Sequence, residues 1–270
     1  MKIVSFDGCG WLFPFHYGVA AYIQDTQDYG TMDFAGISAG ATVAAGLATN
    51  VPIKKVFEDA IRMYGKNPFK MSRSINIILQ KHANHDDDVW KSVSGRLHIG
   101  LSKGHFAWNK KDSCTVSEFQ GREHVIDVIR ASSHLPYLSG LRGHVVDGVR
   151  HFDGGLTSTF AQVRGDTRVI HVSPWSNSIE DWIGSDIGFP QIWAFIPRDF
   201  ESLTDLYDLG YMKAKYFFEK QDNTRALTDK FIKHGAFEVA TRFNPITGAP
   251  VPKYDFFKNG LFRRNLNLGV

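Results

Sequence analysis

The chain has 270 residues, a length that suits one α/β domain, alone or with an extension. Its 31 basic and 28 acidic residues leave a net charge of +3, too weak to indicate nucleic-acid binding in the absence of a basic stripe. The two cysteines are too few for a disulfide framework, and no N-glycosylation sequon is present. These features favour a reducing, cytoplasmic setting.

No targeting segment is visible at the amino terminus, which enters the apolar stretch KIVSF directly. The longest run of small apolar residues, 37–48, is about half as long as a membrane span requires. We therefore expect a chain that does not cross a bilayer.

Strand-like and helix-like segments alternate along the chain. The first half predicts a strand at 2–6, a helix at 13–25, a strand at 32–37 and helices at 39–48 and 52–64. The second half predicts a helix at 123–136, a strand pair at 145–155, strands at 167–174 and 191–197, and a long helix at 198–220. This order indicates an α/β three-layer sandwich with a mostly parallel central sheet, covered on both faces. We expect residues 1–220 to form the catalytic domain and 221–270 an extension packed on it.

The sequence GISAG is the most specific local signal. Its Gly36, Ser38 and Gly40 have G-x-S-x-G spacing and lie between a predicted strand and a predicted helix of small residues. In this setting a strained turn exposes a serine nucleophile, and the flanking glycines avoid steric clashes. We expect Ser38 to be that nucleophile.

A second glycine-rich joint, DGCG, follows the first predicted strand. It is either a simple tight turn or a loop whose backbone N–H groups face negative charge near a helix N-terminus. If the first two strands are parallel neighbours, Gly8, Cys9 and Gly10 lie beside Ser38. These three residues then supply the oxyanion hole that acyl transfer requires.

The base that would activate Ser38 is less clear from the residues alone. A Ser-His-Asp triad is one alternative, with His151, His171 and His234 among the eleven histidines available, but none of the three lies in a distinctive motif. HFDGGL offers Asp153 before two glycines, either in an ordinary turn or at a bend in an active site.

Taken together, DGCG, GISAG and the stretch from IRASSHLPYLSG to HFDGGL resemble the patatin-like phospholipase family over most of residues 1–220. The resemblance implies a Ser-Asp dyad of Ser38 and Asp153, with Gly8, Cys9 and Gly10 as the oxyanion loop. Cys9 replaces the central glycine of the plant and bacterial members, and the basic residue that follows there is absent. This form is closest to the animal branch that includes adipose triglyceride lipase.

The implied function is hydrolysis of carboxylic esters of phospholipids or acylglycerols through an acyl-enzyme, with no metal and no cofactor. The alternatives are a Ser-His-Asp esterase and an inactive lipid-binding relative, and acyl transfer to an alcohol stays open. The expected partner is a lipid ester, at a peripheral membrane or lipid-droplet surface, and no nucleic acid.

Three aromatic segments bear on that surface: 11–15, 67–81 and 256–264. We interpret 11–15 as core and 67–81 as either an interfacial segment or, with slight preference, a half-buried helix. The acidic stretch 82–90 lacks the ligand spacing of a calcium loop and is interpreted as a solvated turn.

Overall fold

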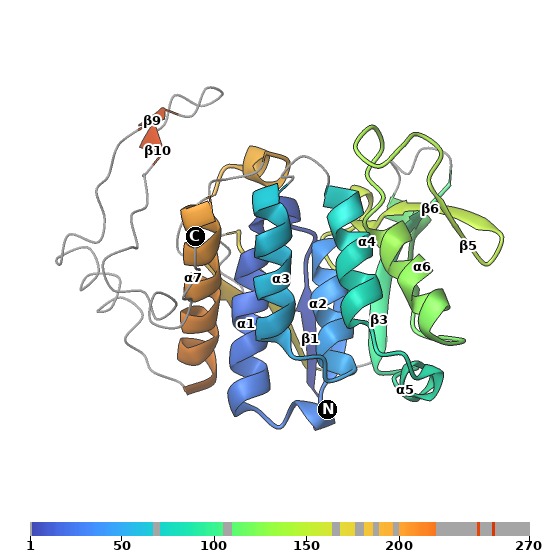
Figure 1. The fold of residues 1–270 in the computed structure, drawn as a ribbon, viewed down its shortest axis with the longest axis horizontal. Helices are drawn as coiled ribbons and strands as arrows, with labels where there is room; N and C mark the ends of the chain where they lie inside the picture. Colours follow the sequence, from blue (N-terminus) through green and yellow to red (C-terminus); the bar gives the residue numbers. More distant parts are fainter. Residues whose placement is uncertain are drawn as a thin grey trace.

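The structure is a computed structural model (Figure 1). It describes residues 2–66, 71–104, 110–163, 168–175, 181–185, 189–196, 200–219, 242–243 and 250–251. Most of the predicted extension, 221–270, and the aromatic segment 256–264 therefore lie outside the described residues.

An eight-stranded sheet forms the centre of the molecule, with the strand order β5-β6-β3-β2-β1-β7-β8 and β4 paired to β3. Its strands are β1 (Lys2–Phe6), β2 (Asp33–Ile37), β3 (Leu97–Lys103), β4 (Ser113–Val116), β5 (His144–Val146), β6 (Val149–Asp153), β7 (Arg168–Ser173) and β8 (Trp182–Gly184). Neighbours from β3 through β2, β1 and β7 to β8 are parallel, whereas β4, β5 and β6 add antiparallel pairs. Two short strands, β9 (Arg242–Phe243) and β10 (Pro250–Val251), pair with each other.

The described helices have mostly the predicted bounds. They are α1 (Phe13–Thr26), α2 (Ala39–Ala48), α3 (Ile53–Lys66), α4 (Met71–His82), α5 (Asp87–Ser92), α6 (Arg122–Ser132) and α7 (Phe200–Glu219). Single 3₁₀ turns are η1 (Gly10–Leu12), η2 (Tyr29–Thr31), η3 (Lys110–Asp112), η4 (Gly154–Leu156) and η5 (Gln191–Ala194).

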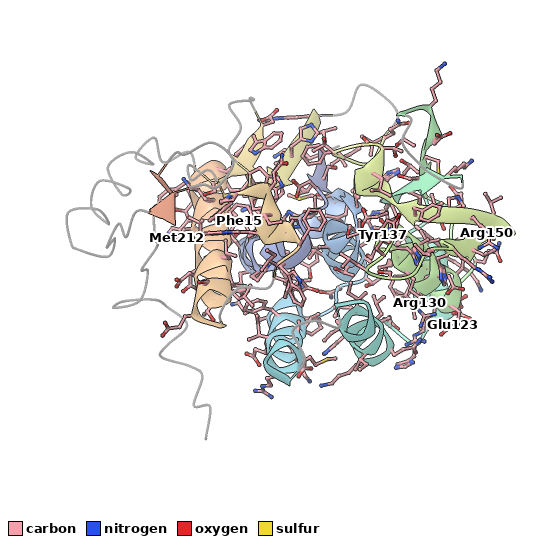
Figure 2. All side chains as sticks on the ribbon, turned by 90° about the horizontal axis from the view of Figure 1, so that it is seen from above. Phe15, Glu123, Arg130, Tyr137, Arg150 and Met212 are labelled. Atoms are coloured by element: carbon pink, nitrogen blue, oxygen red, sulfur yellow. The ribbon has the colours of Figure 1, made fainter. Side chains whose placement is uncertain are left out.

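Layers of helices cover one face of the sheet. Viewed from above in Figure 2, α1 and α2 lie against the strands, and α3 and α4 pack outside them. Residues 14–23 of α1 are all buried because α1 is enclosed by the sheet and the other helices. On the opposite face, Ile3, Ala35 and Ile37 pack against Ala161. The α/β class and the mostly parallel central sheet are thus confirmed.

Three strands of the central sheet were not predicted from the sequence, and one predicted strand is wrong. The strands that were not predicted are β3, β4 and β8; β3 has polar residues among its apolar ones, so it does not read as a simple apolar run. The segment 191–197, predicted as a strand, forms η5 instead, where Phe195 N–H and Ile196 N–H both donate to the Ile192 carbonyl. Its apolar side chains are largely exposed, so no sheet neighbour holds it extended.

The described helices include none that is both long and apolar enough to span a membrane. Within 11–15, Trp11, Leu12 and Phe15 are buried, as predicted. The described part of 67–81 is helix α4, which buries Ile78 and Leu79, so it matches a half-buried helix. The acidic stretch is only partly the solvated turn that we expected, because its residues from Asp87 onward form helix α5 and Trp90 is buried. Asp86 caps this helix by accepting a hydrogen bond from the N–H of Asp88.

Candidate active site

Ser38 lies at the turn between β2 and α2, as its motif predicts. Its backbone has φ 53° and ψ −120°, which a residue with a side chain rarely adopts. A Cβ on Gly36 would lie 2.3 Å from the carbonyl oxygen of Gly40, and one on Gly40 would lie 2.5 Å from that of Asp7. Both flanking glycines are therefore required by close backbone packing around a strained serine.

The turn is held by a neighbour that the sequence reading did not single out. Ser132, at the end of α6, is completely buried. Its hydroxyl accepts from the N–H of Ser38 at 2.8 Å and donates to the carbonyl of Gly100 at 2.7 Å. Ser132 thus fixes the backbone of Ser38 relative to β3.

Asp153 ends β6, two strands away from Ser38 in the sheet. The register pairs Ile37 with Gly100 and Leu101 with Asp153, so both ends reach the same level. A Cβ on Gly154 would lie 2.4 Å from the carbonyl oxygen of Gly100, so the bend after Asp153 packs directly on β3. The fold thereby brings together two residues that are far apart in the sequence.

Asp153 is 2 % exposed. Its Oδ1 accepts a hydrogen bond of 2.8 Å from the N–H of Gly155. Burial raises the pKa of Asp153 to about 6, against the opposing effects of the Ser38 hydroxyl and the Gly155 N–H. Asp153 is therefore a better base than an exposed aspartate near neutral pH.

The Ser38 hydroxyl is near enough to the Asp153 carboxyl group to stabilise its charged form. Oδ2 of Asp153 nevertheless makes no hydrogen bond of normal length and angle to any described residue. Catalytic hydrogen bonds are often long or poorly aligned before substrate binds, so this geometry is compatible with proton transfer between the two groups.

The glycine-rich loop after β1 lies beside Ser38, because β1 and β2 are parallel neighbours. A Cβ on Gly8 would lie 3.4 Å from that of Ser38. Within the described part of the chain, the N–H groups of Gly8 and Cys9 donate no hydrogen bond to the backbone of another residue. Gly10 has φ 53°, and a Cβ there would lie 2.1 Å from the carbonyl oxygen of Ala194, so η5 packs on this loop.

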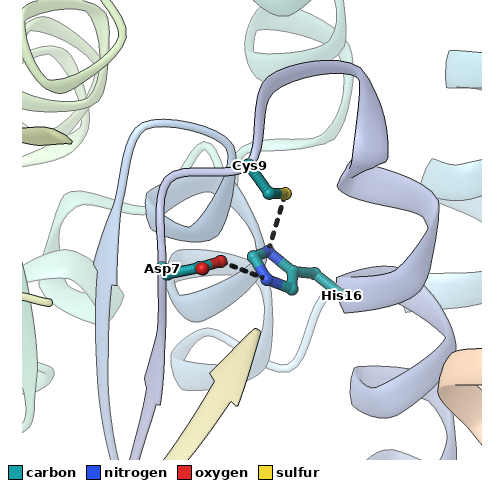
Figure 3. Close-up of side chains that lie close together, drawn as sticks. All are labelled: Asp7, Cys9 and His16. Carbon is teal, nitrogen blue, oxygen red and sulfur yellow. Dashed lines mark hydrogen bonds and ion pairs between the residues drawn. The ribbon is translucent and has the colours of Figure 1, made fainter. Parts of the chain in front are cut away.

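A buried polar cluster underlies the same loop (Figure 3). His16 Nε2 lies 2.9 Å from Asp7 Oδ1, and His16 Nδ1 lies 3.5 Å from Cys9 Sγ. The Ser173 hydroxyl donates to the other oxygen of Asp7. Burial, followed by the nearby Asp7 carboxylate, raises the pKa of the Cys9 thiol well above its ordinary value, so the thiol stays protonated and donates to His16.

Asp7, Cys9 and His16 are also the only described set of three residues that is close enough to hold a metal ion. However, the two ring nitrogens of His16 face different partners, with the imidazole between them. A metal ion bound to one ring nitrogen would also have to be reached by both the thiolate and the carboxylate, but these two groups face different nitrogens of the ring. The arrangement is instead that of a hydrogen-bonded chain, which the sequence reading missed because His16 lies in an apolar helix.

The histidines considered as bases make other contacts. His151 is buried, and its Nδ1 bonds the carbonyl of Val149 at 3.0 Å. The ring of His171 packs against those of Phe160 and Trp182. His234 lies outside the described residues. No histidine of the described part hydrogen-bonds the Ser38 hydroxyl.

Fold and site together define an α/β protein with a strained serine turn beside a buried carboxyl group and a glycine-rich loop. The patatin-like phospholipase family matches residues 4–161, which include all of these features. The chain belongs to this family.

The individual relatives are animal proteins. The chain is 28% identical over 185 residues to mouse 1-acylglycerol-3-phosphate O-acyltransferase Pnpla3, a match that covers 64% of this chain and 43% of the relative. It is 28% identical over 186 residues to cattle patatin-like phospholipase domain-containing protein 2, covering 64% and 37%. It is 26% identical over 171 residues to human omega-hydroxyceramide transacylase, covering 57% and 30%. These matches confirm the animal branch of the family, and they span half or less of each relative's length.

Proposed function

We propose that the chain is a lipid acyl hydrolase in which Ser38 and Asp153 act as a catalytic dyad. The observation that carries the proposal is the pairing of a strained serine with a fully buried aspartate whose pKa is raised to about 6. Family membership supports the substrate class, an ester of a fatty acid. Relatives named as acyltransferase and transacylase suggest acyl transfer to an alcohol as the second candidate.

In the proposed reaction, Ser38 Oγ attacks the ester carbonyl carbon while its proton moves to the Asp153 carboxylate. The carbonyl oxygen becomes an oxyanion, and the proposed donors to it are the N–H groups of Gly8 and Cys9, which donate to no other backbone group of the described residues. Collapse of the intermediate breaks the bond to the leaving alcohol, which takes the proton from Asp153. The product is an acyl group on Ser38.

Deacylation reverses these roles. A water molecule, or an alcohol in the transfer reaction, gives its proton to Asp153 as its oxygen attacks the acyl carbonyl. The second tetrahedral intermediate releases the fatty acid or the new ester and returns the proton to Ser38 Oγ. The same two side chains serve both halves of the reaction, so no histidine is required.

The test is turnover of a soluble short-chain ester, together with labelling by a fluorophosphonate probe. Wild type should turn over and be labelled, and Ser38→Ala should be unlabelled and keep less than about 1 % of wild-type kcat. Ser132→Ala is the comparison variant: it removes a hydroxyl that fixes the turn but leaves the nucleophile in place, so it should still be labelled at Ser38 even where kcat falls. A folded Ser38→Ala protein with near-normal turnover would refute the proposal.

Each alternative function predicts a different result in these assays. If the chain is an inactive lipid-binding relative, the probe will not label Ser38 in the wild type. A triad enzyme would lose activity on changing one of His151, His171 or His234 to Gln, whereas the dyad predicts that each keeps most activity. Glycerol or monoacylglycerol added to the assay would yield new esters if acyl transfer competes with hydrolysis.

A further inference from the structure

The edge of the sheet that carries Ser38 and Asp153 also carries two loops with exposed apolar side chains. In the first loop these are Tyr137, Leu138 and Leu141, with 83 %, 62 % and 67 % of their surfaces exposed. In the second they are Ile192, Phe195 and Ile196, each about half exposed. We call these six residues the rim patch. Both loops lie at the top of the molecule in Figure 1.

Each loop is attached directly to a part of the candidate site. The N–H of Asp153 donates to the carbonyl of His134 at 3.0 Å, just before the first loop. The second loop packs on the oxyanion loop, where the backbone of Ala194 fills the space beside Gly10. The two loops of the rim patch therefore contact different parts of the site, one at Asp153 and the other at Gly10.

The loop segments that carry the rim patch contain no acidic residue, and two exposed arginines border the patch. Residues 128–146 contain no acidic residue, and 189–196 contain no charged residue at all. Arg142 and Arg150 are exposed, and neither is paired with a carboxylate of the described residues. Asp127 and Asp147, the acids that flank residues 128–146 in the sequence, contact His144 and His124 respectively.

We propose that the rim patch docks on the surface of a phospholipid bilayer, with Arg142 contacting anionic head groups. Protruding apolar side chains on loops, bordered by unpaired arginines, suit insertion at a lipid–water boundary more than the flat packing of a protein partner. The proposal rests on the proposed function in one respect, because it takes the docked lipid to be the source of the ester.

The backbone of the first loop supports an outward role for its apolar residues. Tyr137 has φ 69°, a strained conformation for an aromatic residue. Figure 2, seen from above, shows Tyr137 between the centre of the molecule and Arg150 at its margin. The chain thus bears backbone strain at a position where the side chain is almost fully exposed rather than packed.

The experiment measures partition of the full 270-residue chain onto phosphatidylcholine vesicles, with and without anionic lipid. The variants are Leu138→Ser/Leu141→Ser in one loop and Ile192→Ser/Phe195→Ser in the other. Each pair should lower the partition coefficient about tenfold or more. Arg142→Gln should lower binding to anionic vesicles about fivefold and leave neutral vesicles unaffected. Ile77→Ser, which removes an exposed apolar side chain from α4, is the matched control and should bind as wild type.

Turnover of the soluble ester separates this proposal from the proposed function. The rim variants should keep kcat on the soluble ester within about twofold while losing vesicle binding. If wild type is inactive on every ester yet the rim variants still lose vesicle binding, the docking role of the rim patch is supported and the proposed function fails. Equal vesicle binding by the rim variants and wild type would overturn the proposal that the rim patch docks on lipid. Sedimentation that shows a dimer for wild type and monomers for the rim variants would also overturn it, because the patch would then be an interface between two copies of this chain.

Discussion

The carboxyl group of Asp153 combines three properties that one residue position rarely has together. It is buried, it is held at Oδ1 by a single backbone N–H, and its Oδ2 has no regular hydrogen bond among the described residues. Burial raises its pKa to about 6, because the charged form loses water that its neighbours replace only in part. Reactivity and stability are therefore both expected to depend on its protonation.

The first prediction concerns pH and activity. The proposed base must be ionised, so kcat/KM on a soluble ester should rise with pH through an apparent pKa of about 6 and level off above it. Steady-state rates from pH 4.5 to 8 measure this directly. A profile that levels off below pH 5 would mean that Asp153 does not govern the reaction.

The second prediction concerns pH and stability. The folded-state pKa of Asp153 is raised, so the native state holds a proton that the unfolded state releases between about pH 4 and pH 6. The stability associated with this carboxyl group is present at low pH and is lost as pH rises through 6. Asp153→Asn should therefore stabilise the fold at pH 7.5, by on the order of 2 kcal/mol, while abolishing turnover. Urea unfolding at pH 4 and pH 7.5 compares the two, and an equal effect at both would contradict the prediction.

The third prediction concerns His16. Replacing it by alanine leaves Asp7 buried without its ring partner, and breaking a buried pair from one side typically costs about 3–5 kcal/mol. His16→Ala should therefore destabilise the chain strongly in urea unfolding. The double variant Asp7→Asn/His16→Ala should be less destabilised than the sum of the two single changes. Strict additivity would mean that the pair contributes no coupling.

At the level of elements, the two turns could be predicted from sequence because glycine spacing is a local signal. Gly36, Ser38 and Gly40 specify a strand-turn-helix junction without help from distant residues, and the bounds of α2 matched the prediction. The strand β3 could not be read in this way, although it separates Ser38 from Asp153. Gly100 on β3 matters because the bend after Asp153 packs on its carbonyl, a contact that only the tertiary fold creates.

The element-scale prediction compares two glycines of the oxyanion loop. Gly10→Val would not isolate the oxyanion hole, because any side chain there meets the backbone of Ala194 as well as an unfavourable positive φ. Gly8→Ala is cleaner, because its Cβ would be in tight but tolerable contact with Ile37 and Ser38. It should fold with nearly unchanged thermal stability and lose about 10- to 100-fold in kcat, since the methyl group crowds the proposed oxyanion position.

Cys9→Gly provides the matched control for that comparison. It removes the thiol that donates to His16 while keeping the backbone N–H, so kcat should stay within several-fold of wild type. Circular dichroism establishes folding for both variants. A fully active Gly8→Ala enzyme would show that the loop is only a turn, and an inactive but folded Cys9→Gly enzyme would indicate a chemical role for the thiol.

At the scale of the whole molecule, alternation of strands and helices was enough to predict the α/β class, because each apolar segment must be buried against another. The order of strands in the sheet was not predictable in the same way. Asp153 arrives beside β3 on an antiparallel strand, and β7 then returns to pair with β1 on the other side. The candidate pair of Ser38 and Asp153 was nevertheless predicted from the family resemblance, which carries tertiary information that single residues lack.

The predicted boundary at residue 220 leads to the last prediction. Helix α7 packs tightly on α1: a Cβ on Gly18 would lie 1.9 Å from the carbonyl oxygen of Tyr207, and one on Gly210 would lie 2.0 Å from that of Phe15. Leu203 and Tyr207 are buried in the same core. Residues 200–219 thus pack on the same core as α1, which supports the predicted boundary.

A chain ending at residue 220 should therefore remain soluble, with a Tm within about 5 °C of the full chain and unchanged kcat on a soluble ester. A chain ending at residue 199 should aggregate, because it uncovers the apolar surface of α1 that α7 buries. Gly210→Val in the full chain is the matched control: it keeps every residue of α7 but forces the two helices apart, and it should lower Tm as well. Thermal unfolding and gel filtration decide among these outcomes. If the 220-residue chain fails to fold while the full chain is stable, the boundary is wrong and residues 221–270 belong to the catalytic domain.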